Sequence, residues 1–198
     1  TEDVQLYGNI YDAWDYLVSL NQKLTVYFHN LKFDGAFLLS FFLKDKHFKQ
    51  AYNILNEEQT DYEFLSNKDM PNNSVKYLIS DLGQWYTITV KVNNNIIEFR
   101  DSLKLLPFSV KEIGRSFKTK HQKLDMEYEG IRYPNCEITP EEQEYIKNDV
   151  LVVKEALEIM FAEGHDKLTI GACCLNEFKH GFDRFEYRRF FPDLSALE

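Results

Sequence analysis

The sequence predicts an α/β fold in which helices pack on a mixed sheet, and three observations support this class. Residues 24–28 ("LTVYF") are β-branched and aromatic, which is typical of a buried strand. Residues 84–92 and 96–101 have a similar character and flank three asparagines, a signal for a hairpin. Residues 139–162 have helical spacing and helix signals at both ends. Strands mixed with helices in this way indicate a sheet covered by helices.

The first half of the chain begins with residues 4–7, which we expect to form a short strand. Residues 10–20 ("IYDAWDYLVSL") have apolar side chains at helical spacing and predict a helix. After the strand at 24–28, Asp34-Gly35 opens an apolar helix that is expected to continue to about Leu43. Residues 44–75 are rich in Asn, Asp, Glu and Lys and predict an irregular segment, within a loop-rich insertion at 44–80.

The second half of the chain contains two further helix signals. A helical pattern follows Ser109, and residues 118–137 form an irregular connection. Thr139 is a natural N-cap, Pro140 suits the first helical position, and acidic residues follow in the first turn. Gly164 lies just beyond the expected end of this helix.

Composition limits the classes of protein that fit. The 198 residues suit one domain, and 44% hydrophobic and 15% aromatic residues are globular values. No apolar run approaches the roughly 20 residues of a membrane helix. The three cysteines, two of them adjacent, argue against a disulfide framework and favour a reducing, cytoplasmic setting. The net charge of −9 argues against simple electrostatic binding of nucleic acid, but not against a nuclease that uses carboxylates to hold metal ions.

Asp149 lies close to the apolar face of the 139–162 helix, and Tyr145 precedes it by one turn. That face is predicted from Ile146, Val150, Val153, Leu157 and Met160. An ionised carboxylate facing a core is costly unless it is paired or bound to a metal. The alternative is that Asp149 lies just off this face and bonds a neighbour or solvent, and the helix alone favours that alternative.

Asp34, at the junction of a strand and a helix, has a simple alternative as an N-cap. His29 and Asn30, at the end of that strand, could equally make local loop hydrogen bonds. Taken together with Asp149, however, these residues predict two carboxylates that meet at one edge of the sheet. Such carboxylates can hold divalent cations for in-line hydrolysis of a phosphodiester.

Two motifs resemble a known family. "YFHNLKFDGAF" at 27–37 and "YIKNDV" at 145–150 resemble the second and third exonuclease motifs of protein-primed family B DNA polymerases of the bacteriophage type. The resemblance extends to "LGQWY" (82–86), "DSLKLLPFSVKEI" (101–113), "ITPEE" (138–142) and "FFPDLS" (190–195). It implies an RNase H-like (DnaQ-like) exonuclease fold and 3′–5′ proofreading of a primer end.

The resemblance also implies catalytic roles. Asp34 and Asp149 match the aspartates that hold two metal ions, Mg²⁺ or Mn²⁺. Tyr145 matches the tyrosine that orients the attacking water. Lys123 fits a lysine that assists catalysis at the scissile phosphate, although Lys118 and Lys120 stand nearby.

Six residues match positions that hold the single-stranded 3′ end: His29, Asn30, Phe33, Phe37, Ser102 and Leu103. Aromatic rings can stack on bases without sequence preference, as proofreading requires. The alternative for Phe33 and Phe37 is core packing, with Phe37 the stronger core candidate. Ser102 could be only a strand-end hydroxyl, and Tyr145 a packing residue with one hydrogen bond.

The resemblance has one departure. The family's first exonuclease motif, Asp-x-Glu, is expected before residue 1, and "TED" at Thr1–Asp3 does not match it. We therefore expect an N-terminally truncated fragment, 1–198, with little or no nuclease activity alone. The basic aromatic tail at 179–198 would lead toward the polymerase domain.

The expected partners are single-stranded DNA, the rest of the polymerase chain, a terminal priming protein, and a second copy joined through an exposed sheet edge. The expected location is the cytoplasm of a bacterial host, without a membrane. The alternative function is a non-catalytic module that binds single-stranded DNA or a replication partner. A purely structural role would require the His-Asn-Phe-Asp group to serve only packing and capping.

Overall fold

The computed structural model describes residues 4–58, 61–126, 131 and 133–192. Its centre is a five-stranded sheet in the order β1-β7-β6-β5-β2. These strands are β1 (Leu24–Phe28), β2 (Lys49–Gln50), β5 (Ser74–Ile79), β6 (Trp85–Val92) and β7 (Asn95–Asp101). A separate antiparallel pair joins β3 (Tyr52–Ile54) to β4 (Tyr62–Phe64).

The sheet is mixed, as predicted. β5, β6 and β7 are antiparallel neighbours, whereas β1 runs parallel to β7 and β2 runs parallel to β5. The predicted hairpin is confirmed: Asn93 and Asn94 connect β6 to β7 with φ of 50° and 61°, the conformation of a type I′ turn. In the parallel pair, Phe28 lies opposite Asp101. The residues that follow β1 and β7 therefore leave the sheet side by side.

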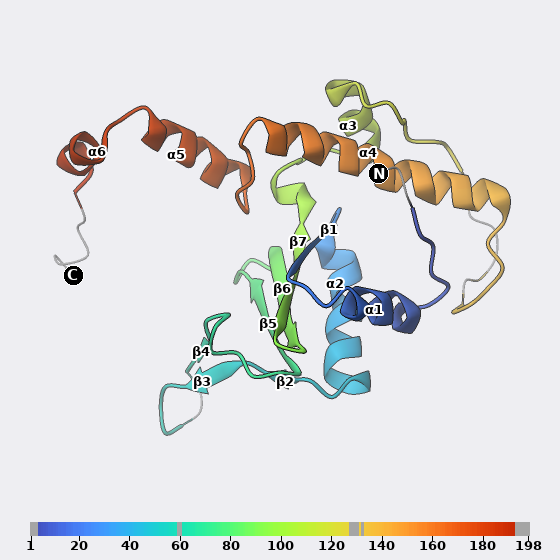
Figure 1. Ribbon diagram of the computed structural model, residues 1–198, viewed down its shortest axis with the longest axis horizontal. Coiled ribbons are helices and arrows are strands. Elements are labelled where there is room, and N and C mark those ends of the chain that lie inside the picture. Colours follow the sequence, from blue (N-terminus) through green and yellow to red (C-terminus); the bar gives the residue numbers. More distant parts are fainter. Residues whose placement is uncertain (1–3, 59–60, 127–130, 132, 193–198) are drawn as a thin grey trace.

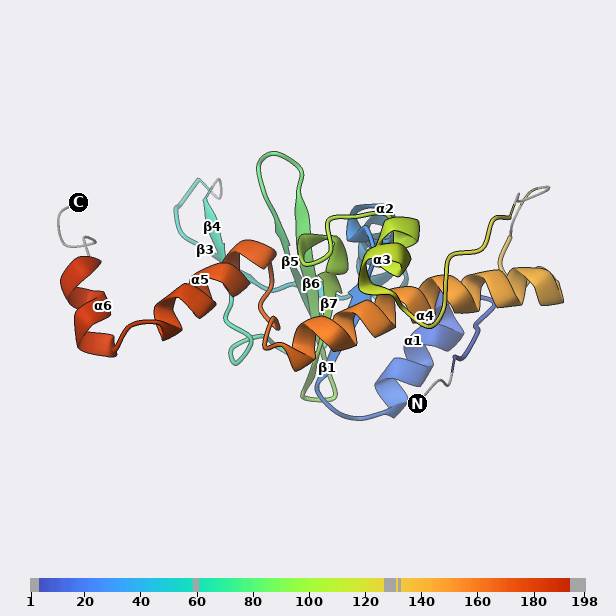
Figure 2. The same cartoon turned by 90° about the horizontal axis from the view of Figure 1, so that it is seen from above.

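Helices cover the sheet and extend beyond it (Figures 1 and 2). They are α1 (Ile10–Ser19), α2 (Leu31–Ser40), α3 (Val110–Phe117), α4 (Pro140–Ala162), α5 (Ile170–His180) and α6 (Arg184–Phe190), with a π-helical turn at Phe41–Asp45 and a 3₁₀ turn at Ser102–Lys104. In both views α4 crosses the end of the sheet, and α5 and α6 continue away from it. None of the helices in the described ranges is long and apolar enough to span a membrane.

Local signals place the ends of α3 and α4 as predicted. The Thr139 hydroxyl accepts the main-chain N–H of Glu142, and the Glu142 carboxylate accepts the N–H of Thr139. Ser109 and Glu112 form the same capping box at α3. Gly164, with φ of +85°, follows α4. These caps satisfy N–H groups that the first turn of a helix leaves unpaired.

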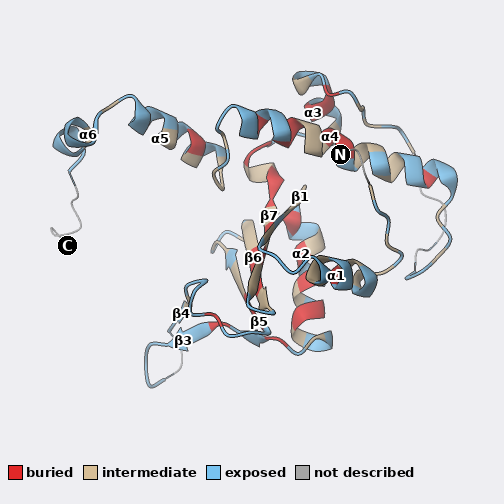
Figure 3. Cartoon of the chain, in the orientation of Figure 1, coloured by how far each residue is buried: buried red, intermediate tan, exposed pale blue. Residues whose placement is uncertain are grey.

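Two hydrophobic clusters hold the elements together, and Figure 3 shows where the buried residues lie along the ribbon. The first joins α1 and α2 to the sheet through side chains such as Trp14, Phe42 and Phe99. The second joins α3 to α4, with Ile113 and Val152 fully buried. Each such burial stabilises by about 1.5–3 kcal/mol. Together they fix α2 along the sheet and α4 across the end from which β1 and β7 emerge.

Several predicted boundaries are wrong. Residues 4–7 form no strand. The segment 44–80 contains four strands between its loops, and β2 and β5 belong to the central sheet. Helix α2 begins at Leu31, so Asp34 lies inside its first turn and is not the N-cap. Asn30 precedes the helix instead, in a left-handed conformation that asparagine tolerates.

The predicted apolar face of α4 is partly wrong. Val150 is exposed, whereas Leu151 and Val152 are buried, because α4 meets α3 on a face rotated from the predicted one. The tail at 179–198 contains the end of α5 and all of α6. Thr1–Asp3, with the "TED" sequence, and residues 193–198 lie outside the described residues.

Candidate active site

The site begins where β1 and β7 end. Asp101, the last residue of β7, is buried, and its Oδ1 accepts the main-chain N–H of Asn30 and of Leu103, each at 3.0 Å. Asn30 has φ of +76°. One carboxylate thus fixes the turn that enters α2 and the turn that leaves β7. The sequence interpretation missed Asp101, although an acid that ends an apolar strand is a signal for it.

His29 and Ser102 are brought together, as the resemblance implies. Ser102 Oγ donates to the carbonyl of Phe28 at 3.0 Å and lies 3.0 Å from His29 Nδ1. His29 Nε2 lies 2.9 Å from the carbonyl of Phe108. The Ser102 hydroxyl thus links the end of β1 to the residue that follows β7. Ser102 is therefore more than a strand-end hydroxyl.

Phe33 and Phe37 form an exposed aromatic pair on α2. Their side chains are 68% and 65% exposed, and their ring centroids are 6.0 Å apart. The interpretation of Phe37 as a core residue is therefore wrong: the buried face of α2 carries Leu31, Gly35 and Leu38 instead. A Cβ added at Gly35 would lie 2.6 Å from the Trp85 ring. This close approach packs α2 directly against β6 and leaves both phenylalanines exposed to solvent.

Asp34 is half-buried on the same helix. Burial raises the pKa of its carboxyl, and its own main-chain N–H opposes that effect. It lines an apolar hollow of about 210 Å³ together with Phe28, Phe37 and Leu38. A carboxylate in such surroundings is costly to ionise without a positive partner.

Lys123, Tyr145 and Asp149 form the second part of the site. Lys123 Nζ lies 2.7 Å from Tyr145 Oη and 2.8 Å from Asp149 Oδ2, and 4.6 Å from the centre of the Tyr145 ring. Burial acts to lower the pKa of Lys123, but the hydrogen bonds that its ammonium donates to Asp149 and Tyr145 raise it, and the net shift is upward. Asp149 Oδ1 is buried and has no hydrogen-bond partner in the described part of the chain.

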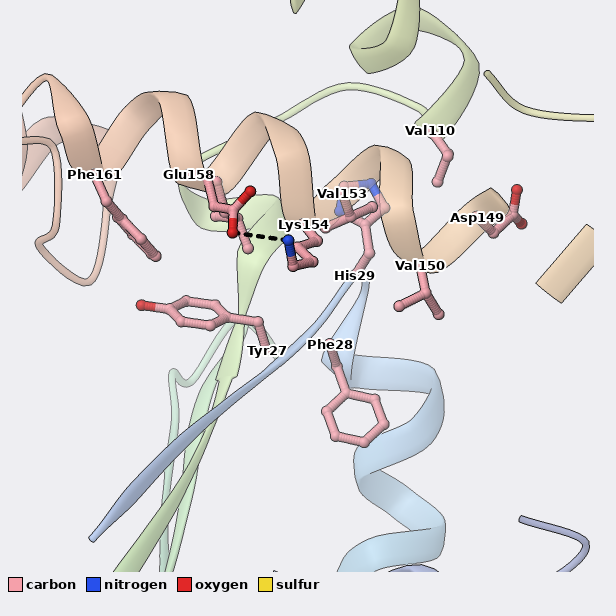
Figure 4. Close-up of a pocket in the computed structure, with 11 residues that line it drawn as sticks. Tyr27, Phe28, His29, Val110, Asp149, Val150, Val153, Lys154, Glu158 and Phe161 are labelled. Carbon is pink, nitrogen blue, oxygen red and sulfur yellow. Dashed lines mark ion pairs between the residues drawn. The ribbon is translucent and has the colours of Figure 1, made fainter. Parts of the chain in front are cut away.

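A hollow of about 570 Å³ extends from Asp149 to the end of β1 (Figure 4). Tyr27 and Phe28 lie below α4, and the His29 side chain rises from the end of β1 toward α4. Val150 and Asp149 lie on the α4 side toward one end, and Phe161 lies at the other. Phe28 also lines the hollow that contains Asp34. Asp34 and Asp149 therefore occupy neighbouring hollows on two sides of the end of β1.

The predicted residues thus form three groups around one sheet edge: Lys123 with Tyr145 and Asp149, His29 with Ser102, and Phe33 with Phe37. Asp34 belongs to the neighbouring hollow. No set of three or more His, Cys, Asp or Glu side chains within the described ranges is placed to hold a metal ion. Asp149 Oδ1 nevertheless offers an unpartnered carboxylate oxygen, the ligand type that Mg²⁺ and Mn²⁺ prefer.

Comparison with known proteins gives consistent matches. Residues 17–135 match the family described as DNA polymerase type B, organellar and viral. The chain is 35% identical to the DNA polymerase of Bacillus phage phi29 over 207 residues, 96% of this chain and 32% of that protein. It is 38% identical to the DNA polymerase of Bacillus phage Nf over 178 residues, 86% of this chain and 28% of that protein.

Solved structures agree. Phi29 DNA polymerase complexed with primer-template DNA superposes with a TM-score of 0.76 at 32% identity, over 94% of this chain and 31% of that one. The same polymerase complexed with single-stranded DNA gives 0.74 at 31% identity, over 91% and 30%. The chain thus spans about a third of the length of these relatives. The predicted RNase H-like mixed sheet with flanking helices is confirmed by this fold match.

Proposed function

Because the chain belongs to the organellar and viral family of type B DNA polymerases, we propose that it forms the 3′–5′ exonuclease part of such an enzyme. It would bind the single-stranded 3′ end of a primer and hydrolyse the terminal phosphodiester within the full-length protein. The observation that carries this proposal is the cluster of Lys123, Tyr145 and Asp149 beside the strand end that bears His29.

The site is suited to divalent cations. Asp34 and Asp149 would hold them. Asp149 Oδ1 has no hydrogen-bond partner among the described residues. Burial raises the pKa of Asp34, and a bound cation would offset the cost of ionising that carboxyl. When bound, Mg²⁺ or Mn²⁺ would activate the attacking water and stabilise charge on the leaving oxygen. Two carboxylates are few for two ions, so we expect the isolated chain to be weak or inactive.

The remaining residues have roles that follow from their chemistry. The Tyr145 hydroxyl would orient the attacking water, and the Lys123 ammonium would stabilise negative charge that develops at the scissile phosphate. The exposed pair of Phe33 and Phe37 would stack on bases. His29, Asn30, Ser102 and Leu103 would hold the terminal nucleotide at the strand ends.

The test is a combined binding and cleavage assay with a 5′-labelled single-stranded oligonucleotide and Mn²⁺. We expect the chain to bind the oligonucleotide and to shorten it slowly at most, from the 3′ end only. Any shortening should disappear in Asp149→Ala. Internal cleavage, or shortening that persists in Asp149→Ala, would contradict the exonuclease proposal. Rapid shortening that Asp149→Ala abolishes would support it and contradict only the expected weakness of the isolated chain.

A second candidate is a non-catalytic module that binds single-stranded DNA or a replication partner. It is favoured by the lack of a three-residue metal cluster within the described residues. This candidate predicts that Phe33→Ala weakens binding, that affinity falls with salt, and that Asp149→Ala changes nothing.

The proposed partners follow from the family. They are the primer 3′ end, the rest of the polymerase chain and a terminal priming protein. A second copy could add a strand beside β1, which pairs only with β7 among the described strands. Since the two relatives named above come from phages of Bacillus, we propose action in the cytoplasm of a bacterial host.

A further inference from the structure

The segment that carries Lys123 is irregular but tightly bonded to the end of α3. It leaves the helix at Lys118, whose φ is 52°. The buried Thr119 donates its hydroxyl to the His121 carbonyl at 2.6 Å. Gln122 Nε2 donates to the carbonyls of Gly114 and Thr119 at 3.1 and 2.8 Å. These contacts shape the turn, but they all lie on the α3 side of it.

Glu155 of α4 holds the turn from the other side. Glu155 Oε2 accepts the main-chain N–H of His121 at 3.2 Å, and Glu155 Oε1 lies 2.5 Å from His121 Nδ1. Both side chains are about four-fifths buried, with exposures of 20% and 18%. Burial acts to raise the pKa of Glu155, but the hydrogen bonds from His121, assisted by the main chain of Lys120, lower it. The carboxylate therefore remains ionised against α4.

The two contact points lie on one rigid helix. Glu155 follows Asp149 by six residues, which is a rise of about 9 Å along α4. Lys123 follows His121 by two residues and reaches Tyr145 and Asp149 with its ammonium group. A lysine side chain loses conformational entropy when it is held in one place. One partly exposed ion pair contributes too little to offset that loss by itself.

We propose that His121 and Glu155 form a clamp that positions Lys123 on Tyr145 and Asp149. His121 and Glu155 touch neither the proposed metal ligands nor the proposed DNA-binding residues, so they are positioning residues. Only the catalytic role of Lys123 rests on the proposed function. The geometry of the clamp itself requires neither DNA nor metal.

The ring of Tyr145 supplies a direct readout. Circulating electrons in an aromatic ring shift the NMR resonances of protons that are held close to the ring. Lys123 Nζ lies 4.6 Å from the ring centre, so the adjacent methylene protons should carry such a shift, assigned by their disappearance in Lys123→Arg. We expect Glu155→Gln and His121→Ala each to move these resonances to the positions of an exposed lysine.

A matched pair elsewhere gives the control. His165 Nε2 lies 3.5 Å from Glu177 Oε2, far along the chain from Lys123. Glu177→Gln makes the same chemical change and should leave the Lys123 resonances unmoved. Retention of the shift in either folded clamp variant, or equal loss in Glu177→Gln, would overturn the proposal. If Glu155→Gln does not fold, His121→Ala decides the result. The measurement uses neither DNA nor metal, so failure of the exonuclease proposal leaves it intact.

Discussion

Replacing Asp101 by alanine removes the acceptor that the main-chain N–H groups of Asn30 and Leu103 share. The side chain of Asp101 is 2% exposed, so water cannot readily replace it. A buried donor left unpaired costs about 1–3 kcal/mol, and two are created, so we expect a loss of about 2–6 kcal/mol. Lys104 Nζ, 3.9 Å from Asp101 Oδ2, would also lose this ion pair, although it keeps its hydrogen bond to Gln84. Such a loss is a large fraction of the typical stability of a domain, about 5–15 kcal/mol.

The assay is equilibrium unfolding in urea, monitored by tryptophan fluorescence. Asp101→Asn is the matched comparison, because an amide oxygen still accepts hydrogen bonds, and it should lose less than half as much as Asp101→Ala. In the same samples, Asp101→Ala should bind single-stranded DNA more weakly than Asp101→Asn. A loss below about 1 kcal/mol in Asp101→Ala would refute the reasoning, since the two amides would then be satisfied without the carboxylate.

Three further predictions concern neighbouring residues. Gly35→Ala places a Cβ 2.6 Å from the Trp85 ring and should cost about 1–3 kcal/mol in urea unfolding, whereas the exposed Ala36→Ser should cost little. Phe33→Ala should weaken binding of a single-stranded oligonucleotide by about 1–3 kcal/mol, measured by fluorescence anisotropy, without lowering stability comparably. The pKa of Glu155 is lower in the folded state than in the unfolded state, so its pair with His121 stabilises the fold at pH values above the unfolded-state pKa. This stabilisation is lost as the pH falls through the folded-state pKa. The stability difference between wild type and Glu155→Gln should therefore narrow on acidification, as seen in urea unfolding at several pH values.

Local sequence signals predicted the elements whose boundaries depend on local contacts. The capping box at Thr139 and the two asparagines between β6 and β7 are such cases, because the residues that bond lie within a few positions of each other. The start of α2 could not be predicted in this way. It depends on the left-handed Asn30, whose N–H bonds Asp101, 71 positions away.

The candidate site likewise contains some residues that local sequence signals identify and others that only the fold identifies. Asp34, Tyr145 and Asp149 stood out as polar groups near apolar faces, but their roles came from the resemblance to a family. Lys123 could not be separated from Lys118 and Lys120 by spacing, and only the fold places its ammonium on Tyr145 and Asp149. His121 and Glu155 carried no signal, since their contact joins residues 34 positions apart.

The most direct test of the central claim, a metal-dependent site at the end of β1, is an NMR titration with Mn²⁺. A bound paramagnetic ion broadens the resonances of nearby nuclei. We predict that substoichiometric Mn²⁺ broadens the resonances of Tyr145 and His29 before others, and that Asp149→Ala abolishes this effect. Broadening confined to another acidic surface, or unchanged broadening at Tyr145 in Asp149→Ala, would contradict the account.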